Sequence, residues 1–322
     1  MKNIFKSIFQ NKRVFVTGHT GFKGTWLTLW LKELGAEITG YSLEPNTTPS
    51  MFNELNLARD INHIIGDIRD EEKLKKAFDE SKPEIVFHLA AQPIVRLSYS
   101  EPKYTFEVNT IGTINVFEAA RACGSVKVIV NVTSDKCYEN QEWIYSYREH
   151  EPMGGYDPYS ASKGCSELIT ASYRKSFFNP KDYGTEHTVA LASGRAGNVI
   201  GGGDWASDRL VPDCARFLSK GEDIIIRSPK SIRPWQHVLE PLAGYLWLAA
   251  LLYTDGATHA DGWNFGPLES DVKTVEEVVS TFIEAWGSGT FIAQTNNILH
   301  EAKLLKLDIS KAQYKLNWKP VY

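Results

Sequence analysis

A glycine-spaced loop between a short apolar segment and a helical segment constrains the fold of this chain most strongly. Residues 13–17 have the pattern of a buried strand, and residues 26–34 have the apolar periodicity of a helix. Between them, Gly18, Gly21 and Gly24 recur at every third position. Gly18 permits a tight turn, Gly21 lets the backbone approach a pyrophosphate, and Gly24 allows the helix to pack closely on the strand. The N–H groups of the first helical turn would then face bound phosphates, so the sequence predicts a dinucleotide-binding unit here.

Strand-like and helix-like segments alternate along the first half of the chain. This alternation favours right-handed βαβ units and a Rossmann-type, doubly wound parallel sheet of the α/β class. Gly35 follows the first helical segment at the C′ position, where glycine commonly ends a helix. The expected strands are residues 13–17, 37–43, 61–65, 85–89 and 126–132, and the expected helices are residues 26–34, 71–78, 109–122 and 159–177.

The pattern changes after residue 195. Glycines cluster at 201–203, and prolines and aromatic side chains become frequent. We expect this part to form a smaller α/β domain over the carboxyl ends of the strands, where open α/β sheets bind ligands. The predicted boundaries are residues 1–194 and 237–260 for the dinucleotide-binding domain and residues 195–236 and 261–322 for the substrate-binding domain.

Composition narrows the class of ligand. The 35 basic and 39 acidic residues give a net charge of −4 without runs of like charge, which disfavours nucleic acid and membrane surfaces as partners. The four cysteines form no CxxC pair, so neither a metal site nor a disulfide framework is expected. The first residues lack the continuous apolar stretch of a signal peptide, and the longest apolar segment, 242–253, is too short to span a bilayer. We expect a cytoplasmic protein with a small-molecule ligand.

A tyrosine and a lysine four residues apart indicate acid–base chemistry. Tyr159 and Lys163 would share one face of a helix. Tyrosine, with a pKa near ~10, is a poor base at neutral pH, but a neighbouring lysine cation and a cationic cofactor ring would favour the phenolate. The phenolate could then take a proton from a substrate hydroxyl while hydride leaves for the cofactor.

The glycine loop, Ser134 and the Tyr159–Lys163 pair together resemble the extended short-chain dehydrogenase/reductase superfamily. Asn109 lies where that superfamily keeps a structural asparagine. The resemblance implies a nicotinamide cofactor bound by Gly18, Gly21, Phe22, Gly24, Ser42, Asp67, Ile68, Leu89, Ala90, Tyr159 and Lys163.

The end of the second expected strand departs from the superfamily pattern. An acidic residue normally stands there and holds the adenosine ribose, whereas this chain has Ser42, with Glu44 two residues later. No basic residue is available there for a 2′-phosphate. We therefore expect NAD rather than NADP, with weaker anchoring of the ribose than in relatives that keep the acidic residue.

The residues after the strand at 126–132 point to one reaction within the superfamily. A 4-epimerase only removes and returns one hydride, whereas nucleotide-sugar 4,6-dehydratases carry Thr-Asp-Glu or a close variant here, which Ser134-Asp135-Lys136 resembles. The resemblance implies that Ser134 hydrogen-bonds the substrate oxygen and that Asp135 is the acid that assists loss of the C6 hydroxyl. Lys136 would be the base at C5; if it keeps its proton, it would instead stabilise the enolate while another group takes the proton.

Several phrases are similar to those of the 4,6-dehydratases that act on CDP-glucose, namely residues 17–27, 91–93, 194–205 and 233–238. This resemblance implies conversion of CDP-glucose to CDP-4-keto-6-deoxyglucose, a precursor of 3,6-dideoxyhexoses in surface polysaccharide such as the O-antigen of lipopolysaccharide. Three arginines stand as isolated basic residues in neutral surroundings, and arginine suits bidentate binding of phosphate. The expected substrate-binding residues are Gln92, Asn198, Arg209, Arg227 and Arg233.

Quaternary structure and the rival functions remain open from the sequence. The expected helices at 109–122 and 159–177 carry apolar faces, and helices at these positions usually pair with a second copy in this superfamily, so a homodimer or a dimer of dimers is expected. A nucleotide-sugar 4-epimerase, or a dehydratase for a dTDP- or GDP-sugar, is the first alternative. A non-catalytic NAD-binding regulator is the remote one, because fold alone does not fix function.

Overall fold

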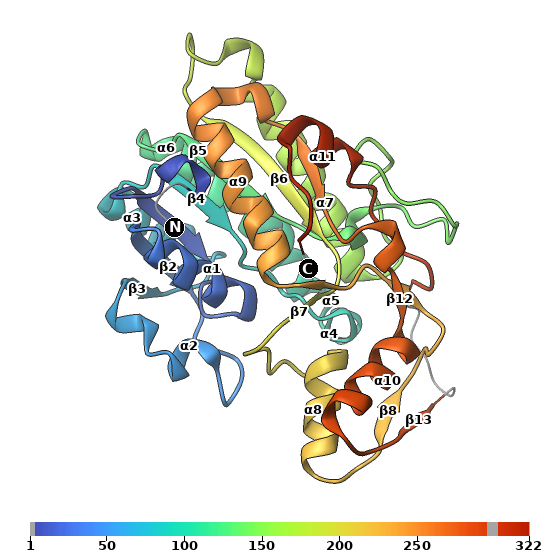
Figure 1. Ribbon diagram of the computed structural model, residues 1–322. Helices are drawn as coiled ribbons and strands as arrows, with labels where there is room; N and C mark the ends of the chain where they lie inside the picture. Colours follow the sequence, from blue (N-terminus) through green and yellow to red (C-terminus); the bar gives the residue numbers. More distant parts are fainter. Residues whose placement is uncertain (1–3, 295–301, 322) are drawn as a thin grey trace.

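The computed structural model describes residues 4–294 and 302–321 and has a seven-stranded parallel sheet at its centre (Figure 1). The strand order is β11-β6-β5-β4-β1-β2-β3, so the chain winds outward in both directions from β1 and β4. This is the doubly wound arrangement that the sequence predicts. The strands are β1 Arg13–Thr17, β2 Glu37–Ser42, β3 Asn62–Ile65, β4 Ile85–His88, β5 Val128–Val132, β6 Ala190–Ala196 and β11 Gly262–Phe265.

Helices cover both faces of the sheet, which explains why its strands are almost continuously apolar. Alternate side chains of β1 point to opposite faces: Val14 and Val16 belong to one buried cluster and Phe15 to the other. In Figure 1 helix α9 lies in front of the sheet. Helices α1 (Phe22–Glu33) and α9 (Leu239–Asp255) pack on the first face, and α3 (Glu71–Ser81), α6 (Gly112–Cys123) and α7 (Pro158–Ser176) pack on the second.

The expected strands and helices of the first half are confirmed, with differences at their ends. The first helix begins at Phe22, four residues before its apolar periodicity starts, because Gly21 is its N-cap and the first turn faces a cleft rather than the core. The expected helix at 109–122 begins as a π-helical turn, Glu107–Ile111, before α6. Gly35 adopts a φ of +80°, as a glycine after a helix end requires.

A small lobe projects from the body at the lower right of Figure 1. It has its own buried cluster around Cys214, Leu218 and Val279, so it is packed as a separate layer. The division into two domains stays a prediction, but one of its boundaries has to be adjusted. Residues 262–265 fall in the range expected for the substrate-binding domain, yet they form the edge strand β11 of the central sheet. The lobe consists of α8 Leu210–Ser219, β8 Ile224–Ile226, α10 Val275–Trp286 and β13 Phe291–Ala293.

Short elements connect these parts. Two small strand pairs lie between the sheet and the lobe: β7 (Val199–Ile200) with β10 (Gln236–His237), and β9 (Ile232–Arg233) with β12 (Lys273–Thr274). The remaining α-helices of the described residues are α2 Met51–Glu54, α4 Val95–Ser100, α5 Pro102–Phe106 and α11 Ser310–Leu316.

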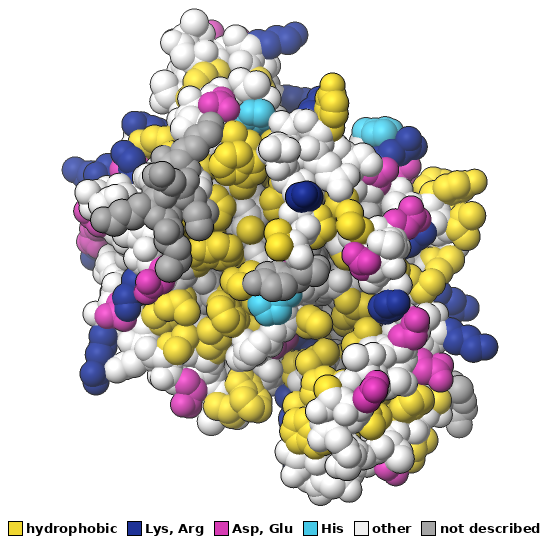
Figure 2. All heavy atoms as spheres, viewed as in Figure 1, with side chains coloured by type: hydrophobic (Ala, Val, Ile, Leu, Met, Phe, Trp, Pro, Cys, Tyr) yellow, Lys and Arg dark blue, Asp and Glu magenta, His cyan; other side chains and the backbone are white. Residues whose placement is uncertain are grey.

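The surface agrees with the near-neutral composition. The face seen in Figure 2 carries hydrophobic, positive and negative side chains intermixed, without a continuous field of one sign. Within residues 4–294 and 302–321, no helix combines the length and the apolar character needed to cross a membrane.

One buried ion pair joins α7 to the sheet. The side chains of Glu167 and Arg195 are 3% and 6% exposed, and 2.7 Å separates Oε2 from Nη2. Glu167 also accepts hydrogen bonds from the hydroxyl groups of Thr133, which follows β5, and of Ser193, in the middle of β6. Burial disfavours the Glu167 carboxylate, but Arg195 and these hydrogen bonds outweigh it, so the pKa of Glu167 is lowered. The pair therefore fixes α7 against β5 and β6.

The variant Glu167→Gln should lower the free energy of unfolding by about 3 kcal/mol, because it leaves the buried Arg195 guanidinium without a counter-charge. Urea denaturation followed by circular dichroism measures this loss. As a control, Glu80→Gln removes a carboxylate from the exposed Lys76–Glu80 pair on α3 and should cost less than about 0.5 kcal/mol. Equal losses in the two variants would contradict the importance of the buried pair.

Candidate active site

A cleft of about 1840 Å³ lies at the carboxyl ends of the parallel strands and extends to the lobe. Open α/β sheets bind their ligands at this edge. All the residues predicted for cofactor, substrate and catalysis line this cleft, although they come from segments far apart in the sequence. They are Gly18, Gly21, Phe22, Gly24, Ser42, Asp67, Ile68, Leu89, Ala90, Gln92, Ser134, Asp135, Lys136, Tyr159, Lys163, Asn198, Arg209, Arg227 and Arg233.

The glycine loop has the tight geometry that a dinucleotide site needs. A Cβ on Gly18, whose φ is +74°, would lie 2.7 Å from the backbone nitrogen of Ala90, and a Cβ on Gly24 would lie 2.0 Å from the carbonyl oxygen of Gly18. Gly21 is exposed, and it caps α1 without a side-chain hydrogen bond. The first N–H groups of α1 are thus left for a ligand, so the loop fits the diphosphate of a dinucleotide.

Ser42 is the last residue of β2, at the position where the superfamily pattern has an acidic residue. Its hydroxyl is 2.9 Å from that of Thr20 in the glycine loop. Asp67 also lines the cleft, but Arg69 binds its carboxylate at 2.6 Å. None of the residues that line this end, from Ser42 to Met51, is basic, and Glu44 is among them. These surroundings favour a free 2′-hydroxyl over a 2′-phosphate.

The residues after β5 form a short 3₁₀ turn, Asp135–Cys137, whose cap is Ser134. The hydroxyl of Ser134 accepts a hydrogen bond from the backbone of Lys136 and donates one to Oδ1 of Asp135 at 3.0 Å. Oδ2 of Asp135 is buried and finds no hydrogen-bond partner in the described part of the chain. Burial raises the pKa of Asp135, although Lys136, Ser134 and Arg233 oppose the shift. A carboxyl group whose pKa is raised in this way is better suited to act as a general acid than a solvated one.

Helix α7 places Tyr159 and Lys163 one turn apart, and both are buried. The helix starts sharply because Asp157 caps it, accepting from the backbone of Ser160 at 2.9 Å. Burial raises the pKa of Tyr159 to about 12, against the effects of Ser134 and a nearby arginine. Burial also lowers the pKa of Lys163 to about 8. That Lys163 and a cationic cofactor ring favour the Tyr159 phenolate stays a prediction, because in the protein by itself desolvation, which a sequence does not reveal, is the largest influence on this pKa.

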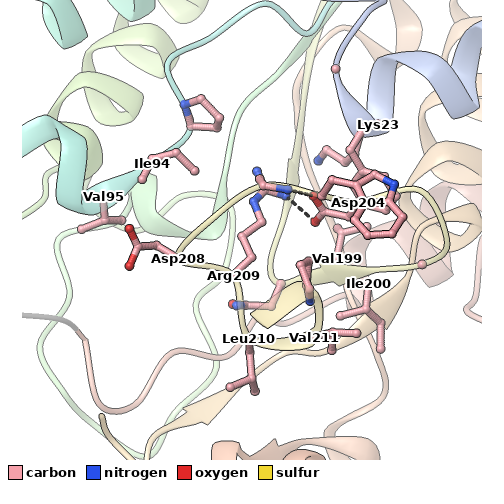
Figure 3. Close-up of a pocket in the computed structure, with 18 of the residues that line it drawn as sticks. Lys23, Ile94, Val95, Val199, Ile200, Asp204, Asp208, Arg209, Leu210 and Val211 are labelled. Carbon is pink, nitrogen blue, oxygen red and sulfur yellow. Dashed lines mark hydrogen bonds and ion pairs between the residues drawn. The ribbon is translucent and has the colours of Figure 1, made fainter. Parts of the chain in front are cut away.

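The arginines are not the isolated cations that the sequence suggested. Arg209 pairs with Asp204 at 3.2 Å, as the dashed lines in Figure 3 show, and Arg227 pairs with Asp208 at 3.1 Å. Arg233 is buried and donates to two backbone carbonyl groups. The sequence did not predict these two ion pairs, because Asp204 and Asp208 lie on a loop whose path only the fold defines. A bound phosphate would have to share or replace these partners.

The side chain of Gln92, which was expected to bind the substrate, forms hydrogen bonds within the protein. Its amide nitrogen donates to Thr105, and its amide oxygen accepts from the backbone of Ile94 at 2.6 Å. Asn109 accepts from the backbone of Gln92 and donates to Ser162, so its expected structural role is confirmed. The Gln92 side chain therefore holds the cleft-lining loop, and direct contact between it and a substrate stays a prediction.

Sequence reasoning missed Lys23, which lines the cleft, and its partner Tyr245. Lys23, between Gly21 and Gly24, reaches from α1 into the pocket (Figure 3), and its Nζ lies 3.5 Å from the hydroxyl of Tyr245 on α9. A basic residue inside the glycine loop was a visible signal, whereas Tyr245 gave none because α9 reads as an apolar helix. The described residues contain no group of three or more histidine, cysteine or acidic side chains that could hold a metal ion.

Comparisons with known proteins agree with this geometry. The family model described as GDP-mannose 4,6 dehydratase matches residues 15–322. The chain is 56% identical to the CDP-glucose 4,6-dehydratase of Salmonella typhimurium strain LT2 over 98% of its own length and 88% of that protein. It also matches the structure of DesIV, a dTDP-glucose 4,6-dehydratase from Streptomyces venezuelae, with a TM-score of 0.81 at 21% identity, covering 96% of this chain and 92% of that one.

An epimerase shares the fold equally well. The structure of the epimerase Mth375 from Methanothermobacter thermautotrophicus matches with a TM-score of 0.82 at 22% identity, covering 99% of this chain and 91% of that one. Identities this low establish the fold alone, so the family rests on the sequence matches. The chain belongs to the GDP-mannose 4,6 dehydratase family, among the extended short-chain dehydrogenase/reductases.

Proposed function

We propose that the protein is an NAD-dependent CDP-glucose 4,6-dehydratase, a hydro-lyase that converts CDP-glucose to CDP-4-keto-6-deoxyglucose and water. The observation that carries this proposal is the 56% identity to the Salmonella enzyme across 98% of the chain. The site supports it, because Asp135 and Lys136 lie in the same cleft as Tyr159 and Lys163. An epimerase needs no acid and base at this point.

The dinucleotide would lie across the glycine loop, with its adenosine near Ser42 and its nicotinamide near Tyr159. When bound, NAD would take the hydride from C4 and return it to C6. Tyr159 would take the proton of the C4 hydroxyl, and Lys163, whose pKa of about 8 leaves it mainly charged at neutral pH, would stabilise the phenolate. Ser134 would hold the oxygen at C4 by a hydrogen bond.

The elimination would fall to the residues after β5. Lys136 would take the proton from C5, which the ketone at C4 makes acidic, or would stabilise the resulting enolate as a cation. Asp135 would give its proton to the C6 hydroxyl, which leaves as water. After hydride reaches C6, a proton returns to C5, and no net oxidation results. Arg209, Arg227, Arg233 and Asn198 would hold the diphosphate and the sugar.

The cytoplasmic location and the oligomer remain part of the proposal. A homodimer, or a dimer of dimers, is supported by exposed apolar side chains on or beside the helices expected to pair: Ile111 is 49%, Leu168 59% and Phe177 45% exposed. Such side chains gain from a partner surface.

The substrate assignment is tested by incubating the purified protein with NAD and, separately, with CDP-, dTDP-, UDP- and GDP-hexoses. We expect loss of one water from CDP-glucose alone, seen by mass and by the ultraviolet absorbance that 4-keto-6-deoxy sugars develop in alkali, without net NADH. Unchanged mass with inversion at C4 would establish an epimerase instead. Loss of water from a different nucleotide-sugar would support the dehydratase reaction but would show that the substrate is not CDP-glucose.

Asp135→Asn should lower kcat by roughly 10²- to 10⁴-fold, because the amide cannot donate a proton to the departing hydroxyl. C4 oxidation should survive, so reduced cofactor should accumulate in single-turnover absorbance measurements. The raised pKa of Asp135 also predicts that wild-type elimination falls as pH rises through that pKa, since the acid form is then lost. A variant that still eliminates water at the wild-type rate would refute this role.

The role of Lys136 is tested by two substitutions and by exchange of the C5 proton with heavy water. Lys136→Ala should lose both exchange and dehydration, whereas Lys136→Glu should recover part of the exchange, because a carboxylate can replace the amine as a base. Lys181→Ala, on an exposed turn that does not line the cleft, is the control. Normal exchange in Lys136→Ala would assign the base to another group.

A further inference from the structure

Asp208 is a charged residue of the cleft that the proposed reaction does not use, and it lies between two arginines. Its Oδ1 atom accepts hydrogen bonds from Nη1 of Arg96 at 3.2 Å and from Nη1 of Arg227 at 3.1 Å. All three residues line the cleft. Because both guanidinium groups meet at one carboxylate oxygen, an anion that replaced the carboxylate would contact two arginines at once.

The three residues come from different parts of the fold. Arg96 lies on α4, Arg227 directly follows β8 of the lobe, and Asp208 belongs to the loop between β7 and α8. In Figure 3 the side chain of Asp208 points toward α4 at Val95, whereas Arg209 of the same loop points the other way. Asp208 therefore links the body of the protein to the lobe beside the cleft.

These two ion pairs can exchange partners at a small cost in free energy. The side chains of Arg96, Asp208 and Arg227 are 52%, 36% and 35% exposed. Ion pairs at such exposure contribute little to stability, so a ligand with more negative charge than one carboxylate can replace Asp208 at the arginines. The diphosphate of a nucleotide is such a ligand, because arginine binds phosphate oxygens through charge-assisted hydrogen bonds.

We propose that Asp208 is an internal competitor of the substrate diphosphate: before the nucleotide binds, its carboxylate occupies Arg96 and Arg227 and so lowers the affinity for nucleoside diphosphates. The proposal rests on the proposed function, which places the diphosphate at Arg227, and it adds Arg96 to the residues that bind it. A bound diphosphate takes both arginines away from Asp208 and repels the carboxylate. The free protein is therefore stabilised relative to the complex.

This competition acts on substrate and product alike. CDP-glucose and CDP-4-keto-6-deoxyglucose carry the same diphosphate, so a carboxylate that weakens the binding of one also weakens the binding of the other. Arginines without this competitor would retain the product, because differences in affinity appear mostly in the rate of dissociation. Asp208 thus favours product release and raises KM. It is a specificity residue, since its charge acts on the diphosphate rather than on the reacting carbons of the sugar.

Equilibrium binding to Asp208→Asn tests this proposal. Calorimetric titrations with cytidine, CMP and CDP compare this variant with the wild type. Asparagine tolerates the φ of +59° at residue 208, so the loop should keep its backbone conformation. We expect Asp208→Asn to bind CDP roughly 3- to 10-fold more tightly, because one opposing charge is removed. The gain should be smaller for CMP, absent for cytidine, and reduced for all phosphates at high ionic strength.

The role of Arg96 is tested by a double-mutant cycle with Asp208→Asn. Arg96→Met should weaken CDP binding more in the Asp208→Asn background than in the wild type, because in the wild type the same substitution also removes a competing ion pair. Arg121→Met, which removes an exposed arginine paired with Glu118 outside the cleft, is the control and should change no affinity. Equal effects of Arg96→Met in both backgrounds would contradict the exchange of partners.

A matched control and the proposed function are separated from this result. Asp60→Asn removes a carboxylate of similar exposure from an ion pair with Lys32 outside the cleft, and it should leave all three affinities unchanged. Unchanged or weaker binding of CDP by Asp208→Asn, or an equal gain for cytidine, would overturn the proposal. A wild type that binds CDP but does not dehydrate CDP-glucose would overturn the proposed function alone, whereas a wild type that binds no nucleoside diphosphate would overturn both.

Discussion

A single buried carboxylate, that of Glu167, couples the two segments that carry the proposed chemistry. It lies four residues after Lys163 on α7, and it accepts a hydrogen bond from Thr133, the residue before Ser134. Its ion pair with Arg195 extends the connection to β6, which is followed by the glycine-rich, cleft-lining segment 197–203. The Tyr159–Lys163 helix and the Ser134-Asp135-Lys136 turn are thereby held in one fixed relation. Because an unpaired charge at this depth is costly, the two segments cannot move apart independently.

Desolvation sets the charges of the cleft more than pairing does. Burial is the largest influence on Asp135, Tyr159, Lys163 and Lys23, and in each case it favours the neutral form. An acid and a phenol with raised pKa values and two lysines with lowered pKa values stand together at the end of the sheet. A group whose pKa lies near the working pH can donate or accept a proton at a small cost in free energy, which is the condition for acid–base catalysis. The cleft walls therefore tune the chemistry that the side chains provide.

The fold is shared with enzymes that perform a different reaction. Epimerase Mth375 and the dehydratase DesIV superimpose on this chain about equally well, so the sheet and its helices do not select between the two reactions. The selection we propose resides in Asp135 and Lys136, directly after β5. These are two side chains on a short turn that otherwise serves the fold.

The sequence by itself determined the parallel sheet and the glycine loop, because apolar periodicity and glycine spacing are local properties that the backbone must obey. It also predicted Tyr159 and Lys163 as one helical face, which requires only helix geometry. It did not predict that Asp204 and Asp208 pair with Arg209 and Arg227, that β11 joins the central sheet, or that Lys23 meets Tyr245 from a helix 222 residues away. Those relations, and the raised pKa of Tyr159, depend on burial and on contacts between distant segments, which only the tertiary structure brings about.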